Sequence, residues 1–136
     1  IANEGKSFNT AMLELKKYLG INAKKTSFCT FGNHDMRILS QSIAYNLSYP
    51  KDVTSLIQKN YIDFSAFISE FCKDENNNPL SLIHYCELFG VELYGEPHDP
   101  EADAVNLANL YDATMKNSEL LKDEYKKVLQ KKIWNL

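Results

Sequence analysis

Two side chains suited to acid–base chemistry at a metal centre, His98 and Asp103, lie five residues apart in the sequence. Asp99 is a good N-cap and Pro100 suits the first helical position, so the pattern predicts a helix that begins at Pro100. Histidine exchanges protons near neutral pH, and hard divalent cations prefer carboxylate oxygens. An imidazole on a loop beside a carboxylate on a helix therefore indicates metal-assisted hydrolysis.

The helix that positions Asp103 is expected to bury one continuous apolar face. Side chains that fit this face recur at helical spacing: Ala104, Leu107, Ala108, Tyr111 and Met115. Asp103 lies next to that face in the first turn, where a carboxylate rarely lacks a partner because an unpaired buried charge is costly. Glu101 complements the positive end of the helix dipole.

Another acid at a predicted helix start, Asp35, follows a short β-branched and aromatic segment at residues 26–31 that we expect to be a strand. Gly32 closes the strand, and Asn33 is expected to cap the helix that follows. Ligand sites in open α/β sheets favour the carboxyl ends of strands, which gives Asp35 a functional interpretation. The alternative is an aspartate that only complements a helix dipole.

Taken together, the two motifs resemble those of the DEDDh 3′–5′ exonucleases of the RNase H-like superfamily. The later motif is His98-x-x-x-x-Asp103 before an apolar helix, and the earlier one is Phe31-Gly32-Asn33-His34-Asp35-Met36. The earlier motif is similar to that of the KapD and Eri-like branch, whose members mostly trim RNA. The segment 80–95 resembles the family's helix before the histidine, so the resemblance covers roughly residues 7–115.

This resemblance implies an α/β, RNase H-like exonuclease fold with a mixed sheet flanked by helices. The chain would hold mainly the helix-rich C-terminal portion, as a single domain over residues 1–136. The implied activity is hydrolysis of phosphodiester bonds at the 3′ ends of single-stranded RNA or DNA, with RNA favoured. Two Mg²⁺ or Mn²⁺ ions would act in the reaction, with Asp35 and Asp103 as metal ligands and His98 as the general base. No substrate-binding residue is assigned.

One motif of the family is missing. Its Asp-x-Glu pair, which supplies two of the four carboxylates, does not occur before Asp35. We therefore expect an upstream segment with three strands and that pair. We expect this chain by itself to be inactive, and to self-associate or to pair with the missing segment. One alternative is a catalytically inactive exonuclease-like module that binds nucleic acid or protein. The other is a helical interaction domain whose motif matches are accidental.

Composition sets the remaining expectations. The 136 residues are 44% hydrophobic and 24% charged, which is typical of one globular domain, and the net charge of −3 argues against tight duplex binding. No apolar run approaches the ~20 residues of a membrane span. Cys29, Cys72 and Cys86 are widely spaced in apolar surroundings, which indicates buried thiols in a reducing compartment and a cytoplasmic location.

Further helices are expected at three places. Ser7 should cap a helix that ends at Gly20, and Asn78 with Pro79 should begin one that ends at Gly90. A last helix is expected to begin at Ser118. Residues 52–60 fit either a short helix or a loop, and residues 61–64 fit a short strand or an extended entry to a helix that Ser65 would cap.

Overall fold

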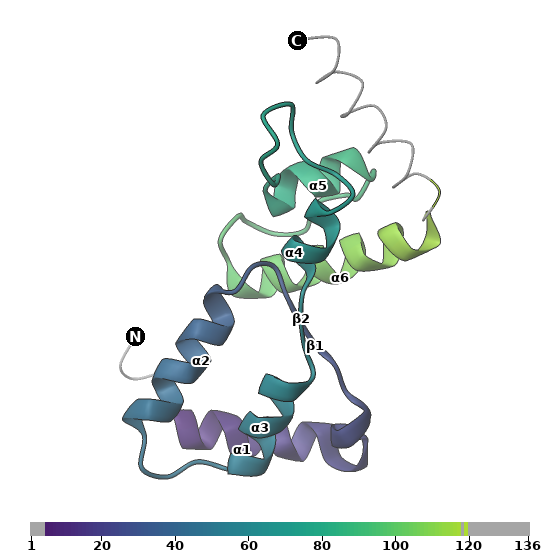
Figure 1. Cartoon of the computed structure of the whole chain (residues 1–136). Helices are drawn as coiled ribbons and strands as arrows, with labels where there is room; N and C mark the ends of the chain where they lie inside the picture. Colours follow the sequence, from purple (N-terminus) through teal and green to yellow (C-terminus); the bar gives the residue numbers. More distant parts are fainter. Residues whose placement is uncertain (1–4, 118, 120–136) are drawn as a thin grey trace. The chain divides into compact units, whose positions relative to one another are not determined.

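The structure, a computed structural model, describes residues 5–117 and residue 119 (Figure 1). Its elements in chain order are α1 (Phe8–Leu19), the 3-10 helix η1 (Gly20–Lys25), β1 (Phe28–Thr30), α2 (His34–Tyr45), α3 (Lys51–Lys59), β2 (Tyr61–Asp63), α4 (Phe64–Ser69), α5 (Leu82–Leu88) and α6 (Pro100–Lys116). The two strands pair in parallel, so the predicted α/β class is confirmed. No helix among these elements is long and apolar enough to cross a membrane. The helix expected from Ser118 lies outside the described residues.

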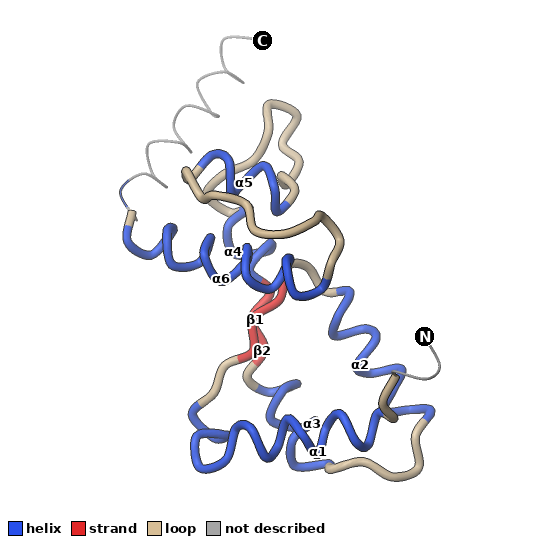
Figure 2. Tube along the Cα trace, turned by 180° about the vertical axis from the view of Figure 1, so that it is seen from behind, coloured by secondary structure: helices blue, strands red, loops and turns tan. Residues whose placement is uncertain are grey.

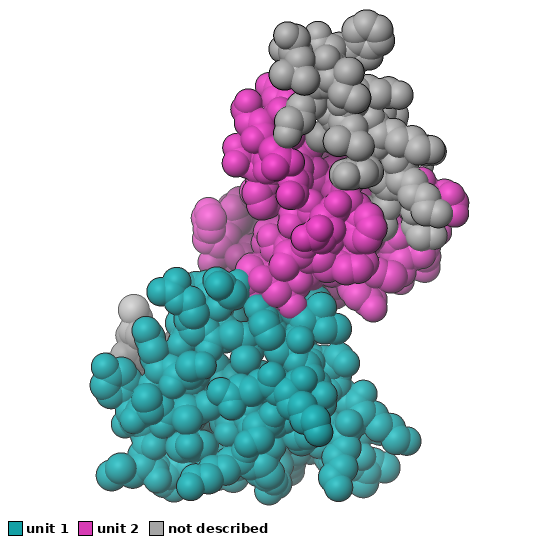
Figure 3. Space-filling view, in the orientation of Figure 1, with its two compact units in different colours: residues 1–29, 33–62 teal, residues 30–32, 63–136 magenta. Residues whose placement is uncertain are grey.

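The chain divides into two compact units (Figure 3). Unit 1 consists of residues 1–29 and 33–62, and unit 2 consists of residues 30–32 and 63–136. Both short strands, drawn in red in Figure 2, run from one unit into the other, because each contains one of the boundaries. Each unit buries its own set of apolar side chains.

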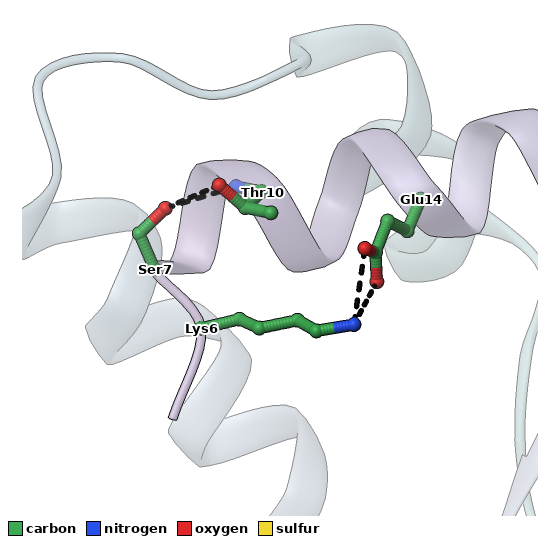
Figure 4. A network of polar contacts seen from close by, with 4 residues as sticks. All are labelled: Lys6, Ser7, Thr10 and Glu14. Carbon is green, nitrogen blue, oxygen red and sulfur yellow. Dashed lines mark hydrogen bonds and ion pairs between the residues drawn. The ribbon is translucent and has the colours of Figure 1, made fainter. Parts of the chain in front are cut away.

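In unit 1, α1 begins and ends as the sequence predicts. The Ser7 hydroxyl caps the helix by accepting a hydrogen bond of 3.1 Å from the backbone N–H of Thr10 (Figure 4). Gly20 ends the helix with φ of 52°, a conformation that glycine adopts without a steric penalty. The Lys6 ammonium pairs with the Glu14 carboxylate at 2.9 Å along the exposed side.

Helix α3 packs on α1 in unit 1. Because α3 ends at Lys59, the segment 52–60 is helix rather than loop for nearly all of its length. The residues buried in this unit are Leu19, Val53, Thr54 and Ile57. Asp52 in α3 forms a 2.7 Å ion pair with Lys16 of α1, and the hydrogen bond from Lys16 lowers the pKa of the Asp52 carboxyl. Both side chains are more than half exposed, so the pair contributes little to stability.

Unit 2 has the larger core. The fully or nearly fully buried residues of this cluster are Phe64, Ile68, Cys72, Tyr85, Cys86, Leu107 and Leu110, and they come from α4, α5, α6 and the segment after α4. Phe31 packs against the cluster, and the centroids of the Phe31 and Tyr85 rings lie 6.0 Å apart. Cys72 and Cys86 are buried as predicted. Cys29 is exposed, which corrects the prediction for that thiol.

Three helix caps differ from the sequence prediction. Helix α5 begins at Leu82, with the Ser81 hydroxyl accepting from the backbone N–H of His84, and not at Pro79. Helix α4 is capped by the Asp63 carboxylate rather than by Ser65. Asn33 precedes α2 without a side-chain cap. Ser81 and Asp63 are equally good capping types. Asp63 lies next to the buried Phe64, and Ser81 lies closer than Asn78 to the buried Tyr85.

Tyr85 fixes the segment between α4 and α5. Its ring is fully buried, and its hydroxyl donates to the Cys72 carbonyl at 2.7 Å and accepts from the Leu80 backbone N–H at 3.2 Å. Burial raises the pKa of the Tyr85 hydroxyl and of the Cys86 thiol. Both groups therefore favour the neutral, protonated form in the folded chain.

Tyr85→Phe is expected to lower the free energy of unfolding by about 1–3 kcal/mol at neutral pH, because one buried and one partly buried hydrogen bond are lost. A raised folded-state pKa stabilises the protein below the unfolded-state value, and this stabilisation is lost as the pH rises toward the folded-state value. Urea unfolding from about pH 7 to about pH 10.5 should thus show stability falling at the alkaline end. The fall should be shallower in Tyr85→Phe, and equal slopes would contradict this account.

Candidate active site

The N-terminus of α6 has the local structure that the sequence predicts. The Asp99 carboxylate caps the helix by accepting a 2.9 Å hydrogen bond from the backbone N–H of Ala102, and Pro100 occupies the first turn. Glu101 and Asp103 are the acidic residues of that turn. Asp103 is partly buried, and its backbone N–H donates to the Asp99 carbonyl at 2.9 Å. The carboxylate of Asp103 is therefore held on a rigid helix end.

His98 lies in the loop immediately before this cap and is exposed. Its φ is 68°, in the left-handed region, and the turn around it is closed by a 3.2 Å hydrogen bond from the Asp99 backbone N–H to the Glu96 carbonyl. A residue with a side chain in this region is held there by its surroundings at a cost of about 1–3 kcal/mol. Such a conformation at a candidate base is consistent with a fixed position for the imidazole.

The side chains of His98 and Asp103 have no competing partners. Within the described part of the chain, neither forms a hydrogen bond or an ion pair. The two residues belong to unit 2, and only the Asp99 cap and the first turn of α6 separate them in the chain. The structure thus brings this predicted pair to one helix end, with both groups available to a ligand.

Asp35, the third predicted site residue, is exposed in the first turn of α2. The turn before it contains Gly32, whose φ of 95° favours glycine. The Gly32 backbone N–H donates to the Asp63 carboxylate at 2.9 Å, so Asp63 anchors the turn in addition to capping α4. Asp35 belongs to unit 1. Its predicted place after a strand is confirmed, while its sharing of a metal ion with Asp103 remains a prediction.

The buried face of α6 differs from the predicted one. The buried residues are Ala102, Asn106, Leu107, Leu110 and Thr114. Of the residues expected on that face, only Leu107 is buried: Ala104 and Ala108 are exposed, and Tyr111 and Met115 are 43% and 45% exposed. Two polar residues replace them because their polar groups bond to backbone: Asn106 bonds to Tyr94, and the Thr114 hydroxyl donates to the Leu110 carbonyl at 2.7 Å. An apolar-only pattern does not detect such residues.

Asn106 is the residue of this region that sequence reasoning missed. Its side chain lies 6% exposed beneath the loop that leads to His98. The available signal was a spacing of four residues: Ala102 and Leu110, which are apolar, alternate with Asn106 and Thr114, which are polar. Residues four apart lie on one face of a helix.

The chemistry open to this helix end is cation binding and proton transfer. Asp103 supplies a carboxylate oxygen suited to Mg²⁺ or Mn²⁺, and His98 supplies a base able to deprotonate a water. Among the described residues, no group of three or more His, Cys, Asp or Glu side chains is placed to hold a metal ion. Two magnesium ions would therefore need carboxylates beyond those at the end of α6.

Comparison of the chain with family models, with curated proteins and with solved structures gave no match.

Proposed function

We propose that this chain carries part of the active site of a metal-dependent 3′–5′ exonuclease with an RNase H-like fold. Asp35 and Asp103 are metal ligands in this proposal, and His98 is the general base for the attacking water. The proposal depends on the resemblance of the two motifs. One structural observation supports it: the start of α6 presents an exposed imidazole and a helix-held carboxylate, neither of which has a partner among the described residues.

The proposed reaction is hydrolysis of the phosphodiester bond at the 3′ end of a nucleic acid. Two divalent ions, when bound, would supply activation of the attacking water and charge stabilisation at the leaving 3′ oxygen. The carboxylates of Asp35 and Asp103 would hold the ions, and the His98 imidazole would take the proton of the water. The Asp-x-Glu pair of the family would complete the carboxylate set, and it does not occur before Asp35 in this sequence.

A second candidate is a catalytically inactive module of the same fold that binds nucleic acid or protein. The lack of Asp-x-Glu before Asp35 favours it, because two carboxylates alone hold two divalent ions poorly. The two candidates make opposite predictions for turnover, although both predict the same fold.

The test is an exonuclease assay on the complete gene product with a 5′-labelled single-stranded RNA in Mg²⁺ or Mn²⁺. We expect the RNA to shorten one nucleotide at a time from its 3′ end, and a chelator to stop the reaction because the ions carry the chemistry. An RNA of the same sequence with a blocked 3′ end is the control and should remain intact. Binding of RNA without any shortening would favour the inactive module.

A further inference from the structure

We infer that Asn106 is a positioning residue that holds the His98 loop on α6, an inference whose catalytic part rests on the proposed function. The loop runs from Val91 to the Asp99 cap and has no regular secondary structure. Such a loop would give the imidazole many positions, and a general base needs one. The question is therefore what fixes this segment to the helix that carries Asp103.

Two hydrogen bonds from one side chain provide the main attachment. The backbone N–H of Tyr94 donates to Oδ1 of Asn106 at 2.8 Å, and Nδ2 of Asn106 donates to the Tyr94 carbonyl at 3.1 Å. The amide thus pairs with both polar backbone groups of one residue, as a neighbouring strand would. The Asn106 amide is buried and both bonds are partly buried, so water competes for these groups less than it would at the surface.

A close backbone contact supports the same attachment one residue later. Gly95 has φ of 65°, and a Cβ built on it would lie 2.7 Å from the Cβ of Ala102. Only glycine fits both this conformation and this distance. Tyr94 and Gly95 are thereby seated on the first two turns of α6, three residues before His98.

The loop is also tied at its two ends. The Val91 backbone N–H donates to the Cys86 carbonyl at 2.8 Å, and the Asp99 cap fixes the other end to Ala102. Between these points, the Asn106 amide is the only side chain among the described residues that hydrogen-bonds to the backbone of residues 92–98. Loss of Asn106 should therefore free the loop while leaving the helix and its cap intact.

The structural test measures amide hydrogen exchange in the complete gene product. In Asn106→Ala, the Tyr94 amide is expected to exchange at least about 10-fold faster, and the His98 signals should shift. Asn109→Ala removes an exposed asparagine of the same helix and is the matched control, with no change expected. Asn106→Asp keeps the shape and the acceptor for the Tyr94 N–H but loses the donor to the Tyr94 carbonyl. The Tyr94 amide should therefore still exchange faster than in the wild-type protein at neutral pH, and this variant remains informative if Asn106→Ala unfolds.

The catalytic test uses the same variants in the RNA assay. Asn106→Ala is expected to lower kcat by about 10- to 100-fold with KM changed less than about 2-fold, because the base is misplaced while RNA binding is retained. Full kcat in Asn106→Ala with an unprotected Tyr94 amide would overturn the positioning role alone. A Tyr94 amide that stays protected would overturn the attachment itself. An inactive wild-type protein would instead overturn the proposed function.

Discussion

His98→Ala in the complete gene product is expected to lower the rate of RNA 3′-end hydrolysis by about 100- to 10,000-fold, the usual contribution of a general base. His98 is exposed, and among the described residues its side chain has no hydrogen bond or ion pair that an alanine would remove. The free energy of unfolding should therefore stay within about 0.5 kcal/mol of the wild-type value. The measurement is kcat in the RNA assay, together with a thermal or urea unfolding curve.

Two further variants make the His98 result specific. His98→Gly removes the same imidazole and also relieves the left-handed backbone at φ of 68°, so it should be as inactive as His98→Ala without being less stable. His84→Ala removes the exposed histidine of α5 and should keep full activity. Wild-type turnover by His98→Ala would show that this imidazole is not the base.

Asp103→Asn is expected to reduce turnover by at least about 100-fold, because a metal ligand provides several kcal/mol of charge stabilisation in the transition state. The amide has nearly the same shape as the carboxylate and one charge less. The first turn of α6 keeps its Asp99 cap and Glu101, so the helix should remain folded. Higher Mn²⁺ concentrations should restore part of the activity if the loss is one of metal affinity.

The matched control for this substitution is Asp112→Asn. Asp112 is an exposed aspartate of the same helix, and it pairs with Lys116 at 2.8 Å. Its replacement removes one negative charge from α6 far along the helix from the candidate site, so turnover should not change. Equal losses in the two variants would indicate a general charge effect and would count against a ligand role for Asp103.

The parts of the fold that the sequence predicts well are those set by short-range chemistry. Ser7 and Asp99 cap their helices as expected, because a cap depends on residues within one turn. The end of α1 at Gly20 and the loop before Pro100 follow from the same local preferences. The capping position of α5 was wrong, since Asn78, Pro79 and Ser81 are all acceptable locally and only packing selects among them.

The buried face of α6 shows what periodicity alone cannot supply. Asn106 is buried because its partner, Tyr94, lies twelve residues earlier in the chain. A polar residue can be buried when a distant backbone satisfies it, and nothing near Asn106 in the sequence reveals that partner. Tyr111 and Met115 are correspondingly more exposed than their apolar character predicts.

The same distinction applies to the candidate site. The loop position of His98 and the first-turn positions of Asp103 and Asp35 follow from local signals in the sequence and are confirmed, although the Asn33 side chain does not cap the helix of Asp35. Whether Asp35 and Asp103 bind one ion depends on long-range folding between residues that belong to different units, and it stays a prediction. That prediction is the centre of the functional proposal.

A Mn²⁺ titration followed by NMR tests it most directly, because this paramagnetic ion broadens the signals of nearby amides. In the complete gene product, the amides around Asp35 and Asp103 should broaden together at the same low Mn²⁺ concentration. Asp103→Asn should abolish the effect at both places, while Asp112→Asn should leave it unchanged. Broadening that persists around Asp35 in Asp103→Asn would mean that the two acids do not hold a common ion, and the exonuclease proposal would fail.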